Sequence, residues 1–179
     1  MKYNIIRYLL ERDTTIIRVP CDYDISKEEY DGLFISNGPG DPKQCKITID
    51  HLADAYRSDT PIFGICLGNQ LMALASGADT YKLKYGHRSH NQPVLEVGTD
   101  KAYITSQNHG YAIDNHSLPK DWEPLFINLN DDTNEGMKHL KKPFFSTQFH
   151  PEASGGPTDT AFLFDLFLDN IRKHKGDLP

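Results

Sequence analysis

The spacing of hydrophobic positions along this chain changes from segment to segment, and each spacing predicts a different kind of element. Residues 3–13 place four apolar side chains on one helical stripe, which predicts a helix. These side chains are Ile5, Ile6, Leu9 and Leu10. A β-branched run follows directly in residues 14–20 and predicts a strand.

Strands and helices alternate through the rest of the first half. Short apolar runs at 32–36 and 61–65 predict strands, and helical spacing at 44–58 and 67–77 predicts helices. This alternation is typical of parallel strands joined by crossover helices. We therefore predict an α/β fold with an open, mostly parallel sheet and flanking helices.

From residue 79 to residue 149 the pattern changes to short runs typical of strands. These runs cover residues 80–86, 92–98, 102–108, 110–114, 123–129 and 143–149. We expect hairpins here, some of which form a small antiparallel layer. A last helical pattern opens after Pro157 and closes with basic residues and Gly176, which predicts a terminal helix. With no internal repeat or linker in the sequence, we predict a single domain over residues 1–179.

Composition narrows the classes of function. The formal charge of −6 comes from acids scattered along the chain, with no long basic block, so we expect no nucleic-acid partner. No apolar run approaches the ~20 residues that cross a bilayer, and the N-terminal stretch is too charged for a signal peptide. We therefore expect no membrane partner and a cytoplasmic location. Small molecules or other proteins are the expected partners.

The cysteine and histidine spacings favour a chain without a metal. Cys21, Cys45 and Cys66 match neither a zinc pair nor a disulfide framework. A sparse, odd set of cysteines suits a reducing compartment. His87 and His90 form an isolated pair in a predicted polar loop, and no two histidines have H-x-x-x-H spacing.

Cys66 lies at a predicted turn from strand to helix, flanked by Gly64 and Gly68. The same frame with serine, G-x-S-x-G, forms the nucleophile turn of many hydrolases, and its glycines avoid collisions between a β-carbon and nearby backbone. At the N-terminus of the following helix, partial positive charge favours thiolate over thiol. The motif alone fits a buried core cysteine equally well, since free cysteines are among the most buried residues.

A base for Cys66 is available directly after the predicted strand at 143–149. His150 and Glu152 are spaced so that the glutamate could orient the imidazole while the imidazole takes the thiol proton. The same tripeptide on its own could equally begin a surface loop. However, Cys66 and the His150–Glu152 pair both lie at predicted strand ends of one α/β chain, which favours a catalytic arrangement over a surface loop.

An oxyanion site requires backbone amides near the nucleophile. The turn at 37–42 supplies Gly38 and Gly40, and Leu67 adds the amide that follows Cys66. Alone, this stretch is an ordinary turn. Because ligands of open α/β sheets bind at the carboxyl ends of the strands, we expect it to form one wall of a pocket there.

Three blocks of sequence resemble the glutaminase domain of class I, triad-type glutamine amidotransferases, which has a flavodoxin-like sheet. They are "SNGPGDP" at 36–42, "GICLGNQ" at 64–70 and "QFHPEA" at 148–153. Two further blocks, "KYGHRSHNQPV" at 84–94 and "TSQNHGYAI" at 105–113, resemble the glutaminase of carbamoyl phosphate synthase, either a small subunit or the leading domain of a fused chain. Anthranilate synthase glutaminases share the first three blocks but are not expected to carry "SQNHGYA".

This resemblance implies roles for the residues singled out above. Cys66 would attack the side-chain amide of glutamine, His150 would protonate the leaving ammonia, Glu152 would hold His150, and water would cleave the γ-glutamyl thioester. Glutamine would be bound by residues of three segments. They are Gly38, Gly40, Leu67, Gln70, Asn108, Gly110 and Tyr111. The family works with a large synthetase component that uses ATP and Mg²⁺, so we expect no cofactor in this chain, which has no phosphate-binding glycine loop.

Two departures from the family pattern stand out. Asn69 occupies a position where the family usually has histidine, beside Cys66, which predicts an effect on thiol reactivity or partner coupling. The family also has an N-terminal domain and a strand before the first helix, and we interpret this chain, which contains neither, as a segment of a longer protein. Three other interpretations stay open: a non-catalytic module that binds glutamine or docks on the synthetase, the glutaminase subunit of another amidotransferase such as anthranilate synthase, and a cysteine hydrolase of peptides or γ-glutamyl compounds.

Overall fold

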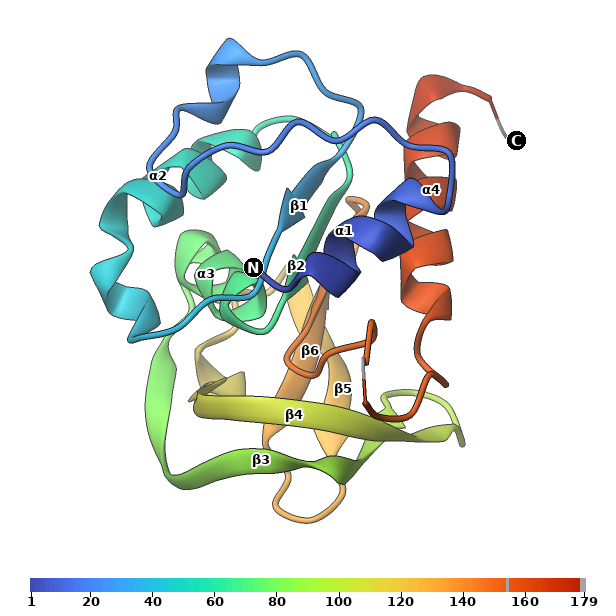
Figure 1. The fold of residues 1–179 in the computed structure, drawn as a ribbon. Coiled ribbons are helices and arrows are strands. Elements are labelled where there is room, and N and C mark those ends of the chain that lie inside the picture. Colours follow the sequence, from blue (N-terminus) through green and yellow to red (C-terminus); the bar gives the residue numbers. More distant parts are fainter. Residues whose placement is uncertain (154, 178–179) are drawn as a thin grey trace.

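The computed structural model describes residues 1–153 and 155–177, which build a seven-stranded sheet flanked by helices (Figure 1). The strands are β1 (Leu33–Ile35), β2 (Ile62–Ile65), β3 (Thr80–Glu96), β4 (Ala102–Ile113), β5 (Trp122–Asn128), β6 (Asn134–His139) and β7 (Phe144–Thr147). Their order in the sheet is β1-β2-β7-β6-β5-β3-β4. β1, β2 and β7 are parallel, and the other neighbours are antiparallel.

The helices connect and cover this sheet. They are α1 (Tyr3–Leu10), α2 (Lys46–Ala55), α3 (Leu67–Ser76) and α4 (Phe162–Lys175), with short 3-10 turns at η1 (Ile25–Lys27), η2 (Pro42–Gln44) and η3 (Asn115–Ser117). α3 and α4 each end at a left-handed glycine, Gly77 and Gly176, as helix C-termini commonly do. Every helix in the described part of the chain is too short or too polar to traverse a lipid bilayer.

This arrangement confirms the predicted fold class, an α/β fold with an open sheet, flanking helices and an added antiparallel part. The antiparallel strands continue the parallel ones in the same hydrogen-bonded sheet, with β6 pairing directly with β7. The parallel strands are the ones whose carboxyl ends carry the predicted chemistry.

Side chains that alternate along the parallel strands build a core on each face of the sheet. Phe63 and Ile65 of β2 pack with Phe145 of β7 against α1 and α4. Ile62 and Phe144 pack on the opposite face, toward α3. Figure 1 shows α1 next to α4, and α2 next to α3. Because β2 and β7 are covered on both faces, the positions of their carboxyl ends are fixed by the core.

The prediction of a strand at residues 14–20 is wrong, since these residues form neither helix nor strand. The apolar pattern does report burial, because Ile16 packs against the core. However, β1 pairs only with β2 among the described strands, so residues 14–20 have no neighbouring strand to pair with.

β3 and β4 are each continuous where the sequence predicts two short strands. Gly86, at φ 69°, and a register shift just before His87 interrupt the pattern without ending the strand. His87 and His90 therefore lie on β3 and not in a loop. β6 was not predicted, because its buried residues Asn134 and Glu135 are polar.

Candidate active site

Cys66 occupies a sharp turn between β2 and α3. Its backbone adopts φ 57° and ψ −103°, a left-handed conformation that costs a non-glycine residue ~1–3 kcal/mol. The Cys66 amide donates a hydrogen bond to the Thr147 carbonyl oxygen at 2.8 Å. The strained turn is therefore tied to the end of β7, the strand that leads to His150.

Gly64 and Gly68 leave the room that this turn needs, as the sequence predicts. A β-carbon on Gly64 would lie 2.6 Å from Met72 Sδ and 2.8 Å from the carbonyl carbon of Gly68. A β-carbon on Gly68 would collide with the carbonyl oxygen of Ile35 in β1. Because backbone atoms cannot rotate away, both glycines are required for α3 to begin directly against the strands.

The Cys66 thiol is buried, with 6% of the residue exposed. Burial raises the pKa of this thiol to about 11, and the Leu67 amide, which donates to the sulfur, offsets only part of that increase. The amide at the helix N-terminus therefore acts in the predicted direction, toward the thiolate, but burial outweighs it. A thiol with its pKa raised in this way is protonated near neutral pH and would need a base to act as a nucleophile.

His150 and Glu152 lie directly after β7 and contact each other. His150 Nδ1 donates to Glu152 Oε1 at 2.8 Å, and both side chains are buried. Burial acts to raise the pKa of Glu152, but the hydrogen bond and charge of His150, with the charge of Lys2, outweigh it and hold that pKa below its usual value. An ionised Glu152 keeps the proton on Nδ1, which leaves Nε2 of His150 available as a base.

Residues at the start of α1 support Glu152, and sequence reasoning did not single them out. Lys2 Nζ lies 3.4 Å from Glu152 Oε1, and Asn4 Nδ2 donates to the Glu152 carbonyl oxygen at 3.2 Å. The Lys2 amide also donates to Asn37 Oδ1 at 2.9 Å. This segment therefore links the glutamate to the glycine turn after β1. No motif signals these contacts, because they depend on how α1 packs across the strand ends.

The glycine turn after β1 lies against Leu67, the first residue of α3. A β-carbon on Gly38 would lie 2.6 Å from Leu67 Cδ2, so the turn packs on the residue that follows Cys66. Gly40 adopts φ 99°, a conformation suited to glycine. The structure thus brings the turn to the start of α3, where an oxyanion site is predicted, and that role stays a prediction.

The other predicted glutamine-binding residues come from β4 and α3. The Asn108 carbonyl oxygen accepts a hydrogen bond from the Cys66 thiol, with Sγ 4.0 Å away, while the Asn108 residue itself is exposed. Gln70 Nε2 donates to the Tyr111 carbonyl oxygen at 2.9 Å and so joins α3 to β4. Gly110 lies between Asn108 and Tyr111. The structure brings the Asn108 carbonyl oxygen to Cys66 and joins Tyr111 to α3 through Gln70, and the contacts of all four residues with glutamine stay a prediction.

Asn69 is buried, and its side-chain amide is directed at β7 and the residues after it. Its Oδ1 accepts a hydrogen bond from the Ser146 hydroxyl at 2.7 Å, and its Nδ2 donates to Gln148 Oε1 at 3.1 Å. Gln70 Nε2 donates to the same Gln148 oxygen at 3.0 Å. Asn69 therefore connects the first turn of α3 to the strand that leads to His150.

A strained cysteine at the end of one parallel strand and a buried histidine–glutamate pair after the neighbouring strand form the arrangement of a triad-type amidotransferase. The family model described as "Glutamine amidotransferase class-I" matches residues 1–170, so the chain belongs to that family. The chain is similar to the carbamoyl phosphate synthase arginine-specific small chain of Aspergillus clavatus, with 56% identity over 180 residues that cover 99% of this chain and 40% of that protein. Its similarity to the small chain of the same name from Saccharomyces cerevisiae is 56% over 182 residues, covering 98% of this chain and 44% of that protein.

Solved structures share the fold. One is a Thermoplasma acidophilum protein assigned as part of a GMP synthase, with a TM-score of 0.79 and 26% identity over 98% of this chain and 90% of that one. Another is a glutamine amidotransferase from Thermotoga maritima, with a TM-score of 0.57 and 20% identity over 92% of this chain and 70% of that one. The resemblance drawn from the sequence blocks is confirmed. The chain spans 40% of the length of the Aspergillus clavatus small chain.

Proposed function

We propose that this chain hydrolyses the side-chain amide of glutamine to glutamate and ammonia through a thioester on Cys66. The observation that supports this most directly is the hydrogen bond between the Cys66 amide and Thr147 of β7, the strand that precedes the His150–Glu152 pair. It supports the proposal that His150, from the neighbouring strand end, acts as the base for the Cys66 thiol. The similarity to carbamoyl phosphate synthase small chains agrees with this chemistry.

In the proposed reaction, Nε2 of His150 takes the proton from the Cys66 thiol as sulfur attacks the amide carbon of glutamine. The amide oxygen becomes an oxyanion, which the Leu67 amide and the amides of the glycine turn stabilise. His150 then gives its proton to the leaving nitrogen, and ammonia departs. Water attacks the thioester while His150 takes its proton, which releases glutamate and restores the thiol. Glu152 holds the imidazole and balances its charge throughout.

We propose further that the ammonia passes to a large carbamoyl phosphate synthetase component, fused or separate, that uses ATP and Mg²⁺. Direct transfer prevents the ammonia from being protonated and lost in solvent. The name of the relatives, an arginine-specific small chain, favours supply of carbamoyl phosphate for arginine synthesis. The three cysteines of this chain are free, which favours a reducing compartment such as the cytoplasm.

Structural features weigh against two of the other interpretations, the non-catalytic module and the peptide hydrolase. A module that only bound glutamine would need neither a strained Cys66 nor a buried His150–Glu152 pair, and such features are costly to maintain. A peptide hydrolase would need an open groove along its nucleophile, whereas Cys66 and His150 are both buried. A small substrate fits this enclosure better.

Glutamate release from glutamine tests the proposed function. We expect turnover by the wild-type chain, measured with and without the synthetase component, and loss of turnover in Cys66→Ala. Cys45→Ala is the matched control, because Cys45 is a free thiol outside the predicted site. Equal rates for the wild type and Cys66→Ala would disprove the thioester route.

A further inference from the structure

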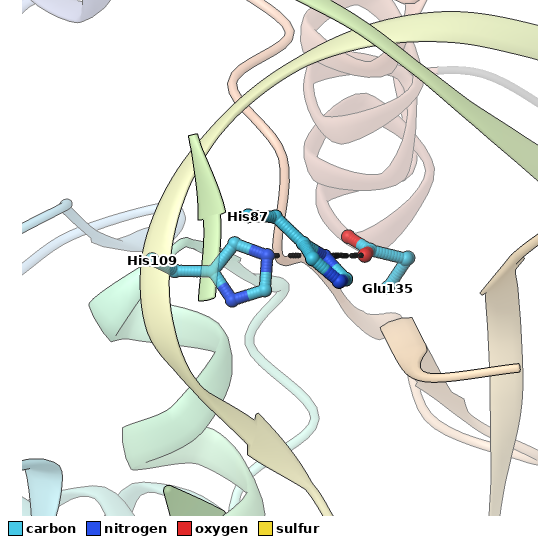
Figure 2. Close-up of side chains that lie close together, drawn as sticks. All are labelled: His87, His109 and Glu135. Atoms are coloured by element: carbon cyan, nitrogen blue, oxygen red, sulfur yellow. Dashed lines mark hydrogen bonds and ion pairs between the residues drawn. The ribbon is translucent and has the colours of Figure 1, made fainter. Parts of the chain in front are cut away.

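A second cluster of chemically reactive side chains lies in the antiparallel part of the sheet, on three different strands. His87 of β3, His109 of β4 and Glu135 of β6 each turn one nitrogen or oxygen inward, and these atoms all lie within 4.8 Å of one another. Glu135 Oε1 is 3.1 Å from His87 Nδ1 and 3.8 Å from His109 Nε2. Figure 2 shows the three side chains converging. Two imidazoles and a carboxylate form a common ligand set for zinc.

The outer nitrogen of each imidazole is held by an oxygen that can only accept a hydrogen bond. His87 Nε2 lies 2.8 Å from Asp131 Oδ2, and His109 Nδ1 lies 2.9 Å from the carbonyl oxygen of Tyr111. Both outer nitrogens therefore carry hydrogen. Metal-binding histidines are held in this way, because the outer bond fixes the tautomer that points a lone pair at the metal.

The orientation of the Gln107 amide limits which protonation states are possible for the inner nitrogens, His87 Nδ1 and His109 Nε2. The Thr105 hydroxyl donates its one hydrogen to the Gln92 carbonyl oxygen at 2.8 Å, so toward Gln107 it can only accept, and it receives Gln107 Nε2 at 3.1 Å. Gln107 therefore presents its oxygen to the cluster, 2.8 Å from His87 Nδ1 and 3.1 Å from His109 Nε2. Each inner nitrogen must face this oxygen with either a proton or a lone pair coordinated to a cation.

Protons on the inner nitrogens of both histidines would be an unfavourable way to meet the Gln107 oxygen. With hydrogens on all four ring nitrogens, His87 and His109 would both be cations, with ring centroids 4.8 Å apart and His109 fully enclosed. Asn128 Nδ2 is a possible donor to His87 Nδ1, but at 3.5 Å it lies closer to Glu135 Oε1, at 3.1 Å. The second oxygen of Glu135 is buried and has no hydrogen-bond partner among the described residues.

We propose that His87, His109 and Glu135 bind a divalent transition-metal ion of the zinc type, with the Gln107 oxygen beside it. A tetrahedral zinc site with bonds of about 2.0–2.1 Å separates its ligand atoms by about 3.3 Å, within the spread of distances here. The ion uses the inner lone pairs of the two imidazoles and Oε1 of Glu135, the carboxylate oxygen that faces them. This inference departs from the expectation of a metal-free chain, which considered only spacing along the sequence.

The proposed ion would be structural, since its ligands are enclosed and belong to three strands. It would join β3 and β4 to β6 close to Asn108 and Gly110, which flank His109 on β4. The charges of Glu135 and His150 act across the space between this cluster and the Cys66 site, but zinc binding does not depend on the proposed hydrolysis of glutamine.

The competing state of the cluster is protonation of His87 alone, which leaves the inner nitrogen of His109 facing the Gln107 oxygen without a proton. Without a metal ion, the hydrogen bond from Glu135, supported by Asp131, raises the pKa of His87 to about 9, against the opposing effect of burial. His87 would then be an imidazolium bridging two carboxylates near neutral pH. Zinc binding distinguishes the two occupants directly.

The test uses the full chain, stripped with a chelator, reloaded with Zn²⁺, desalted, and assayed for metal by mass spectrometry. We expect about one zinc per chain in the wild type and loss of that zinc in Glu135→Gln. His116→Asn is the matched control, because His116 is an exposed histidine outside the cluster. Cobalt substituted for zinc should give the visible absorption of a tetrahedral site with nitrogen and oxygen ligands.

A second variant guards against misfolding of Glu135→Gln. Asp131 lies near the surface and, of the three proposed ligands, contacts only His87, so Asp131→Asn should keep the fold and weaken zinc affinity about 10–100-fold. No stoichiometric zinc in the folded wild type would overturn the proposal and leave the proton as occupant. Equal retention of zinc in Glu135→Gln and Asp131→Asn would also overturn the proposal, because the zinc would then be bound elsewhere. Loss of zinc in Cys66→Ala would show that Cys66 binds it and would overturn the proposal too.

Discussion

A single methyl group added at Gly68 should lower catalytic activity far more than it lowers stability. In Gly68→Ala the new β-carbon collides with the Ile35 carbonyl oxygen and lies 2.8 Å from the Ile35 carbonyl carbon. Both atoms belong to the backbone of β1, so no side-chain rotation relieves the contact. The first turn of α3 must move away from β1, and Cys66 moves with it.

The size of this collision sets the expected loss of stability and the expected loss of catalytic rate. Overpacking of this kind costs about 1–3 kcal/mol, and for a chain of this size each kcal/mol lowers Tm by about 2–4 °C. A displacement of about 1 Å at a reacting group costs about 10²-fold in rate. We therefore expect Gly68→Ala to fold, with a lower Tm and a kcat/KM for glutamine reduced about 100-fold.

Gly77→Ala is the matched control, at the other end of the same helix. Gly77 has φ 95° and open space around its missing β-carbon, so alanine there costs about 1–2 kcal/mol of backbone strain. That variant should lose similar stability and keep its kcat/KM. Thermal melts and initial rates of glutamate release provide the comparison. Equal kcat/KM values for the two variants would refute the idea that contact with β1 sets the position of Cys66.

Three further predictions concern the same site. Glu152→Gln removes the charge that orients His150 and should lower kcat about 10²–10⁴-fold with the fold intact; a variant with more than half the wild-type rate would contradict the proposed role. Because a thiol with a pKa of about 11 is protonated below that pH, the rate of Cys66 alkylation in the substrate-free protein should rise about tenfold per pH unit from pH 7 to 10. A plateau below pH 8 would show instead a preformed thiolate. Asn69→His breaks the paired hydrogen bonds to Ser146 and Gln148, so urea melts should show a loss of about 1–3 kcal/mol while kcat changes little; unchanged stability with altered kcat would place Asn69 in the chemistry.

The sequence predicted the parts of the site that depend on local geometry. Gly64 and Gly68 flank a turn whose steric needs are set within five residues, and both are tightly enclosed in the structure. The contact between His150 and Glu152 likewise follows from short spacing after a strand. The thiol pKa of Cys66 could not be predicted in this way, because it depends on burial by distant segments.

Errors in the fold have a related cause. Residues 14–20 have the composition of a strand, but a strand also requires a neighbour, which local pattern does not report. β6 lacks the apolar alternation of a buried strand, because Glu135 is a polar residue buried by its partners in the His87 cluster. His87 and His109 face each other only through the pairing of β3 with β4, and their separation along the chain hides this.

The most direct measurement of the central claim is the covalent state of Cys66 during turnover. The wild-type chain, mixed with radiolabelled glutamine, quenched in acid and digested, should carry the label as a γ-glutamyl thioester on the peptide that contains Cys66. Cys66→Ala should carry none, and Cys45→Ala should retain the label. Glutamine turnover by the wild type with no label on Cys66, or with the label on Cys21 or Cys45, would contradict the account.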